Sequence, residues 1–153
     1  ERPASRWPRP RGERSPPDGS PPADFLYKKE KTGSESTGNS SLPDGAQLYV
    51  QNCQSCHQAN GEGLPGAFPP LKGSPVVNGN DLDLYVNIIM RGYDPRPEYA
   101  SMPAIGLVNG LSPEEVTAII NHERSSWGNN ARPVSPDEVK KIMDFILLTE
   151  KQQ

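Results

Sequence analysis

The stretch QNCQSCHQAN, residues 51–60, contains both cysteines of the chain and one of its two histidines. Two residues separate Cys53 from Cys56, and His57 follows directly. A thiolate is a nucleophile and a metal ligand, and a neutral imidazole is the commonest metal ligand in proteins. The C-x-x-C-H spacing therefore concentrates three chemically active side chains in five residues, and four kinds of site use such groups.

Three of the four interpretations explain the motif poorly. A disulfide between Cys53 and Cys56 would close a very small loop, gain little stability and leave His57 without a role. A thioredoxin-like redox pair requires a βαβ setting, which the sequence lacks. A zinc site requires four ligands, and the adjacent Cys56 and His57 do not readily face one tetrahedral ion. The soft or imidazole donors of the chain are Cys53, Cys56, His57 and His122.

The fourth interpretation is covalent attachment of a c-type haem. Thioethers from Cys53 and Cys56 would reach the two vinyl groups on one side of the porphyrin, and His57 would lie under the iron as a ligand. The motif uses every cysteine of the chain. We therefore favour this interpretation and predict one covalently attached haem c.

The sixth coordination position of the iron has four candidate ligands in the sequence, or none at all. Met90 and Met143 fall at apolar positions of predicted helices, where packing explains them. His122 lies within another predicted helix. Met102 lies in a loop, directly before Pro103, and a flexible thioether on a loop pinned by proline suits a ligand that approaches from the distal side.

The rest of the sequence predicts an all-α fold. Helical patterns cover residues 44–56, 80–92, 112–128 and 135–150, and no segment has the alternation of a strand. The last two helices begin alike, with a serine cap, a proline at the first position and a glutamate three residues after the serine, which is a capping-box pattern.

Long loops over residues 61–75 and 92–106 separate these helices, and both are rich in proline and glycine. Loops of this length usually wrap something or have a function of their own. Four short helices with so much loop cannot easily close a core on their own side chains. We therefore expect a large apolar group in the middle of the fold.

Residues 1–40 differ in composition from the rest of the chain. Seven Pro, four Gly and six Ser make up 17 of these 40 positions, so the segment is expected to be an irregular extension or linker. It carries a net charge of +2, against −5 for residues 41–153. No apolar run approaches the length of a membrane span, and no leader is recognisable, so we expect a mature or trimmed chain with room for a membrane tether upstream of residue 1.

Two stretches carry a resemblance to a known family. GAQLYVQNCQSCHQANGEGLPGAFPPLKGSP and MPAIGLVNGLSPEEVTAIINHERSSWGN together resemble a class I c-type cytochrome, the monohaem, His/Met-ligated bacterial cytochrome c family, over roughly residues 43–130. The resemblance implies a cytochrome c fold of short helices and long loops wrapped around one covalent haem. The cytochrome domain would span residues 41–153, with residues 135–150 as an additional C-terminal helix.

The resemblance also implies roles for single residues. "MPA" before a final helix is the ligand motif of the family, which assigns Met102 to the iron. Pro69 or Pro70 should offer a backbone carbonyl to the second nitrogen of His57, and Leu71 should pack on the haem. The predicted cofactor-binding residues are therefore Cys53, Cys56, His57, Pro69, Leu71 and Met102, with His57 and Met102 as the iron ligands.

The function that follows is electron transport rather than catalysis. We expect a periplasmic or otherwise extracytoplasmic monomer that carries single electrons by outer-sphere transfer between membrane respiratory complexes or redox enzymes, and that binds no nucleic acid. One alternative is a cytochrome domain excised from, or tethered to, a larger oxidase, dehydrogenase or reductase. Another is a ligand-binding haem sensor or a peroxidase-like enzyme, which would need an open sixth position on the iron.

Overall fold

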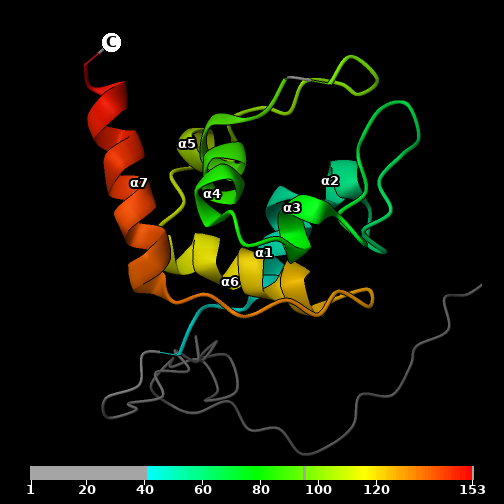
Figure 1. Cartoon of the computed structure of the whole chain (residues 1–153), viewed down its shortest axis with the longest axis horizontal. Coiled ribbons are helices and arrows are strands. Elements are labelled where there is room, and N and C mark those ends of the chain that lie inside the picture. Colours follow the sequence, from blue (N-terminus) through cyan, green and yellow to red (C-terminus); the bar gives the residue numbers. More distant parts are fainter. Residues whose placement is uncertain (1–40, 95, 153) are drawn as a thin grey trace, which may run out of the picture. The chain divides into compact units, whose positions relative to one another are not determined.

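The computed structural model describes residues 41–94 and 96–152, and this part of the chain is helical. Its elements are α1 (Gly45–Asn52), α2 (Gln54–His57), α3 (Pro75–Asn78), α4 (Leu82–Arg91), α5 (Ile105–Asn109), α6 (Pro113–Ser125) and α7 (Pro136–Glu150) (Figure 1). Pairing of extended backbone is limited, within the described residues, to two isolated bridges. The predicted all-α class is confirmed. The predicted extension, residues 1–40, lies outside the described residues.

The two long C-terminal helices begin with the same capping device, as their sequences predict. At the start of α6 the Ser112 hydroxyl accepts a bond from the Glu115 N–H (3.2 Å), and the Glu115 carboxylate accepts one from the Ser112 N–H (2.8 Å). Ser135 and Glu138 repeat the arrangement at the start of α7, at 3.3 and 2.8 Å. Each box satisfies two N–H groups that a helix start would otherwise leave unpaired.

Helix boundaries differ from the predictions in two ways. The single helix predicted over residues 44–56 is divided at Cys53, whose φ of −123° leaves the helical region. Two short helices, α3 and α5, occupy segments that we predicted as loop or did not assign. With four and five residues they are too short to show helical periodicity. The Ser74–Pro75 start of α3 repeats the serine cap and first-position proline of α6 and α7, and this signal could have been used.

Helix α1 crosses α6 at close range. A Cβ atom on Gly45 would lie 2.2 Å from the carbonyl oxygen of Ala118, so only glycine permits this approach. One turn later the ring of Tyr49 lies against two aromatic rings from α6 and the segment after it, with centroids 5.4 Å from His122 and 5.1 Å from Trp127. The crossing fixes the start of the C-x-x-C-H segment against α6.

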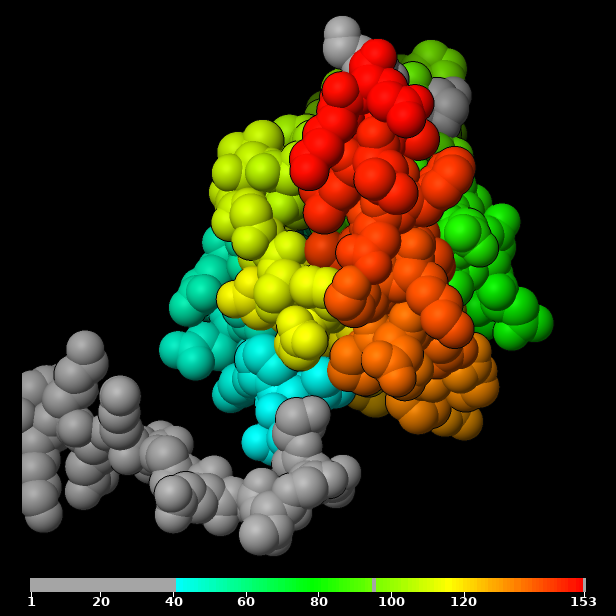
Figure 2. All heavy atoms as spheres, turned by 90° about the vertical axis from the view of Figure 1, so that its left-hand side faces the viewer, coloured from blue at the N-terminus to red at the C-terminus, as the bar shows by residue number. Residues whose placement is uncertain are grey.

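Helix α7 covers one face of the folded unit, as Figure 2 shows. Its buried side chains, Val139, Met143 and Ile146, join the core that α4 and α6 form. At its C-terminal end the Glu150 carboxylate accepts a bond from Arg91 of α4 at 2.8 Å. None of the helices in the described ranges is both long and apolar enough to span a bilayer.

Candidate functional site

One cavity of about 250 Å³ brings the predicted site residues together. Most of its wall is apolar and comes from α3, α4, α6 and the two long loops. All six predicted cofactor-binding residues line it: Cys53, Cys56, His57, Pro69, Leu71 and Met102. Residues from both halves of the described sequence thus converge on one space, as a shared ligand would require.

The C-x-x-C-H segment forms a single tight turn. The N–H groups of Cys56 and His57 both donate to the Cys53 carbonyl, at 3.2 and 3.0 Å. Gln58 then ends α2 with a φ of +66°, which turns the chain sharply away. The two thiols are free, and no disulfide joins them. This turn therefore presents both sulfur atoms and the imidazole to the same cavity.

The His57 ring is fixed by the loop that follows it. Its Nδ1 lies 2.9 Å from the carbonyl oxygen of Pro69, and because a carbonyl can only accept, Nδ1 carries the hydrogen. This tautomer leaves the lone pair on Nε2, the other ring nitrogen. Burial lowers the pKa of His57, partly offset by the Pro69 bond, so the imidazole is neutral at physiological pH. Of the two prolines that the sequence left open, Pro69 makes the contact.

Glycines that the sequence analysis did not single out allow this loop to close. Gly63 has a φ of +63°, and a Cβ there would lie 2.3 Å from the Phe68 carbonyl and 2.7 Å from that of Pro69. The Gly61 carbonyl accepts bonds from the N–H groups of Leu71 and Lys72, at 2.8 and 2.9 Å. These bonds close the loop between residues 61 and 72, and the Pro69 carbonyl within it is held toward His57.

Met102 enters the cavity from the second long loop and is held by its backbone. It forms an isolated antiparallel bridge with Tyr93, with bonds of 3.0 and 3.1 Å. A Cβ on Gly92, whose φ is +81°, would lie 2.2 Å from the Met102 carbonyl oxygen, so glycine is needed at that position. A bond of 2.9 Å from the Ala100 N–H to the Ala67 carbonyl joins this loop to the first.

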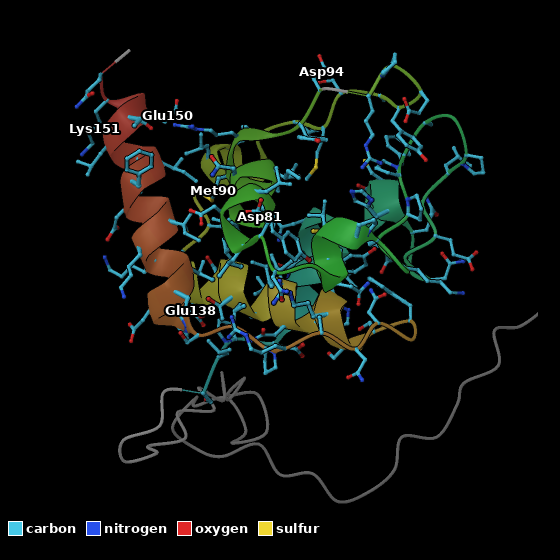
Figure 3. All side chains as sticks on the ribbon, in the orientation of Figure 1. Asp81, Met90, Asp94, Glu138, Glu150 and Lys151 are labelled. Carbon is cyan, nitrogen blue, oxygen red and sulfur yellow. The ribbon has the colours of Figure 1, made fainter. Side chains whose placement is uncertain are left out.

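The other three candidates for the sixth ligand lie elsewhere. Met90 is buried in α4 and faces α5, where its sulfur would lie 2.3 Å from a Cβ on Gly106 (Figure 3). Met143 is buried in α7. His122 packs on Tyr49, and none of these three residues lines the cavity. Met102 is therefore the methionine that shares the cavity with His57.

The residues present fit a haem c. Two free thiols at the attachment spacing, a neutral imidazole with its Nε2 unprotonated and one thioether line a cavity whose remaining wall is mostly apolar. Such a wall suits the porphyrin ring. Among the buried side chains that line the cavity, one carboxyl departs from this apolar character.

That departure is Glu123, which the sequence analysis missed. Glu123 is 3% exposed, lines the cavity and accepts a hydrogen bond from the Tyr85 hydroxyl. Burial raises the pKa of its carboxyl to about 7, and the Tyr85 bond lowers it in part. Its place in the sequence, in the polar-looking run NHER, gave no signal of burial. A helical projection of α6 could have found it, because Glu123 lies four residues after Ile119 on the same helix face.

Comparison with known proteins identifies the same region. Residues 42–127 match the family described as Cytochrome c. The chain is 34% identical over 110 residues to cytochrome c-552 of Thermus thermophilus, a match that covers 65% of the chain and 83% of that protein. It is 36% identical over 104 residues to the cytochrome c subunit of alcohol dehydrogenase (quinone) of Gluconobacter oxydans (strain 621H), covering 64% of the chain. It is also 37% identical over 108 residues to the fructose dehydrogenase cytochrome subunit of Gluconobacter japonicus, covering 65% of the chain. The match spans only 21% and 22% of those two subunits.

Proposed function

The chain belongs to the cytochrome c family, whose cofactor is a covalently attached haem c, and we propose that Cys53, Cys56, His57 and Met102 hold that haem. The observation that carries the proposal is the shared cavity, which these four residues line together. Cys53 and Cys56 would form the thioethers, and His57 and Met102 would be the iron ligands. Pro69 and Leu71 complete the predicted set, one through its carbonyl and the other as an apolar wall.

The protein is an electron carrier, and its residues set the conditions for that task. Bound haem supplies a one-electron couple between ferrous and ferric iron. The Pro69 carbonyl orients the His57 ring and raises the basicity of Nε2. The Met102 thioether would favour the ferrous state, and an apolar wall would penalise the extra charge of the ferric state. Both effects favour a relatively high reduction potential.

We further propose that the chain catalyses no reaction of its own. Redox enzymes are its partners, as the dehydrogenase subunits among its relatives suggest, and an extracytoplasmic location is part of the proposal. A monomer that docks briefly at the haem edge would suit rapid exchange, because transient redox encounters bury little surface. Mixing the reduced protein with candidate oxidases and reductases, and following reoxidation by absorbance, identifies the partners.

A second candidate function is that of a cytochrome module in a larger dehydrogenase assembly. The chain spans about a fifth of the length of the alcohol and fructose dehydrogenase cytochrome subunits that it resembles. In this version the segment before residue 41 would serve as a tether, and electrons would arrive from an attached dehydrogenase rather than by diffusion. The mass and haem content of the protein isolated from its own cells distinguish a single-haem carrier from such a module.

Covalent attachment is the first test of the proposal. After extraction with acidified organic solvent, the colour should stay with the protein, and the mass should exceed that of the chain by one haem. A variant with both Cys53→Ala and Cys56→Ala should release its haem into the solvent. Release of haem from the unaltered protein would contradict the proposed attachment.

A further inference from the structure

Glu123 is the buried acidic side chain of the cavity, and neither haem attachment nor iron ligation uses it. A carboxylate loses several kcal/mol of hydration when it is buried, unless a cation or several donors compensate. Its side chain has one hydrogen-bond partner among the described residues, the Tyr85 hydroxyl. Its nearest helix neighbours on the same face, Ile119 and Ile120, are fully buried and apolar. The carboxyl therefore has a weakly compensated charge whenever it is ionised.

The titratable groups nearest Glu123 carry no positive charge that could stabilise its carboxylate. The charge of Glu123 acts on Tyr49 of α1, Tyr85 of α4 and Cys53, which lies between α1 and α2. Both tyrosines are neutral near pH 7, because burial raises their pKa values, and Cys53 cannot ionise once it is a thioether.

The neighbouring cation, Arg124, has its hydrogen bonds elsewhere. Its guanidinium donates to the carbonyl oxygens of Arg132 (2.8 Å) and Gly79 (3.0 Å), and it lies over the Tyr85 ring, 5.7 Å from the centroid. Within the described residues it makes no ion pair with Glu123. Two further cationic side chains line the cavity from the long loops, Arg96 and Lys72, and Lys72 is paired with Glu62 at 3.0 Å. Bound iron would add a positive charge to this cavity, and that charge would change with the oxidation state of the iron.

We propose that Glu123 is a proton-binding site whose occupancy is linked to the oxidation state of the haem iron, so that the protein takes up a proton together with its electron. The inference rests on the proposed function, because it requires haem in this cavity. A bound metal ion is commonly the largest local charge in a site and controls the ionisation of groups near it. Ferric iron therefore favours the carboxylate, and ferrous iron, with one positive charge fewer, favours the carboxylic acid.

The coupled reaction balances in electrons and protons. A one-electron donor supplies one electron to the ferric protein, and solvent supplies one proton, which forms an O–H bond on the Glu123 carboxyl. When an acceptor removes the electron, that O–H bond breaks and the proton returns to solvent. The uptake is less than one proton per electron outside the pH range in which Glu123 is ionised in the ferric form and protonated in the ferrous form. Because burial raises the pKa of Glu123 to about 7, that range lies near neutral pH.

The test is the reduction potential of the haem-loaded protein as a function of pH, for unaltered protein and for Glu123→Gln. Glutamine has nearly the same shape and cannot ionise. We expect the unaltered potential to fall as pH rises through the neutral range. Glu123→Gln should match it at pH 5, exceed it at pH 9 and show a flatter profile. Any other titrating group, the haem propionates included, contributes to both proteins and cancels in the difference.

Two further measurements test independently whether Glu123 binds the proton. Tyr85→Phe removes the hydrogen bond that stabilises the carboxylate, so the fall in potential should move to higher pH. Infrared difference spectra on reduction at pH 7 should show a protonated-carboxyl band that Glu123→Gln lacks. If both variants keep the unaltered pH profile while all three proteins retain covalent haem and a reversible couple, the inference is wrong and the proposed function stands. Failure of the unaltered protein to bind haem would overturn the proposed function instead.

Discussion

Met102 illustrates how a ligand can be positioned through its backbone. Both of its backbone hydrogen bonds go to Tyr93, and Gly92 lets the chain pass directly beneath its carbonyl. The backbone on either side of the side chain is therefore held independently of the thioether. Replacement of the side chain should leave this segment in place, which makes Met102 a suitable residue for a test of iron ligation.

We predict that Met102→Ala vacates the sixth coordination position. The ferric spectrum should lose the weak far-red sulfur-to-iron band and become high-spin or water-ligated, and the ferrous form should bind carbon monoxide. The reduction potential should fall, because the thioether no longer favours ferrous iron. Absorbance spectroscopy and potentiometry provide the measurements. The fold should survive, since the proposed thioethers and His57 still hold the haem.

The buried methionines provide the matched controls. Met90→Ala and Met143→Ala should leave the spectrum unchanged and lower the free energy of unfolding by about 2–5 kcal/mol each, because both side chains are buried. The assignment of Met102 fails if Met102→Ala keeps a sulfur-ligated spectrum while one of these variants loses it.

The site residues that are adjacent in the chain could be predicted from the sequence, whereas contacts between residues far apart in the chain could not. Cys53, Cys56 and His57 are adjacent in the chain, so their spacing alone indicates their chemistry. The Pro69 contact required the structure, because the sequence offered two neighbouring prolines with equal claims. Glu123 was missed because it stands in a polar run of sequence, although its spacing from Ile119 places it on the buried face of α6.

Among the elements, the helices with strong start signals were predicted best. Both capping boxes occur as expected, because they depend on residues only three positions apart. The break at Cys53 was not predictable from helical periodicity, since the apolar pattern continues across it. That break is imposed by the tight C-x-x-C-H turn, which belongs to the site rather than to the helix.

The capping box of α7 has a predicted pH dependence. Arg132 and Ser135 hydrogen-bond Glu138 and lower its pKa to about 2, which favours the folded state when Glu138 is ionised. Between this pKa and the ordinary value near 4.5, the unfolded chain binds more protons, so stability falls as the pH decreases through that range. Glu138→Gln should reduce stability at pH 7 and flatten this acid branch, as measured by urea unfolding from pH 7 to pH 2.

A matched control for this variant is Glu62→Gln. It removes the charge from an exposed carboxylate that pairs with Lys72 and accepts a hydrogen bond from Asn60, and exposed ion pairs of this kind contribute little to stability. An acid branch that is equally steep in Glu138→Gln and in unaltered protein would contradict the role assigned to the α7 box.

At the scale of the whole molecule, the packing core and the cofactor cavity are built from the same helices and share Tyr85, Ile89 and Ile119. Helices α4 and α6 pack on α7 and also line the cavity, whereas no residue of α7 lines it. The additional C-terminal helix predicted from the sequence therefore supports the site through α4 and α6. Met90 and Met143 belong to the core and do not line the cavity, so their replacement should change stability and leave the spectrum unchanged.

The boundary near residue 40 stays a prediction, and truncation tests it. Residues 1–20 contain five prolines and little apolar surface, so their removal costs little burial. We predict that a chain starting at residue 21 folds, attaches haem and keeps both its spectrum and its urea midpoint. Further removal of residues 24–31 should lower the midpoint only if Phe25, Leu26 and Tyr27 pack on the cytochrome domain. Unfolding after loss of residues 1–20 alone would show that the cytochrome domain begins earlier in the chain than residue 41.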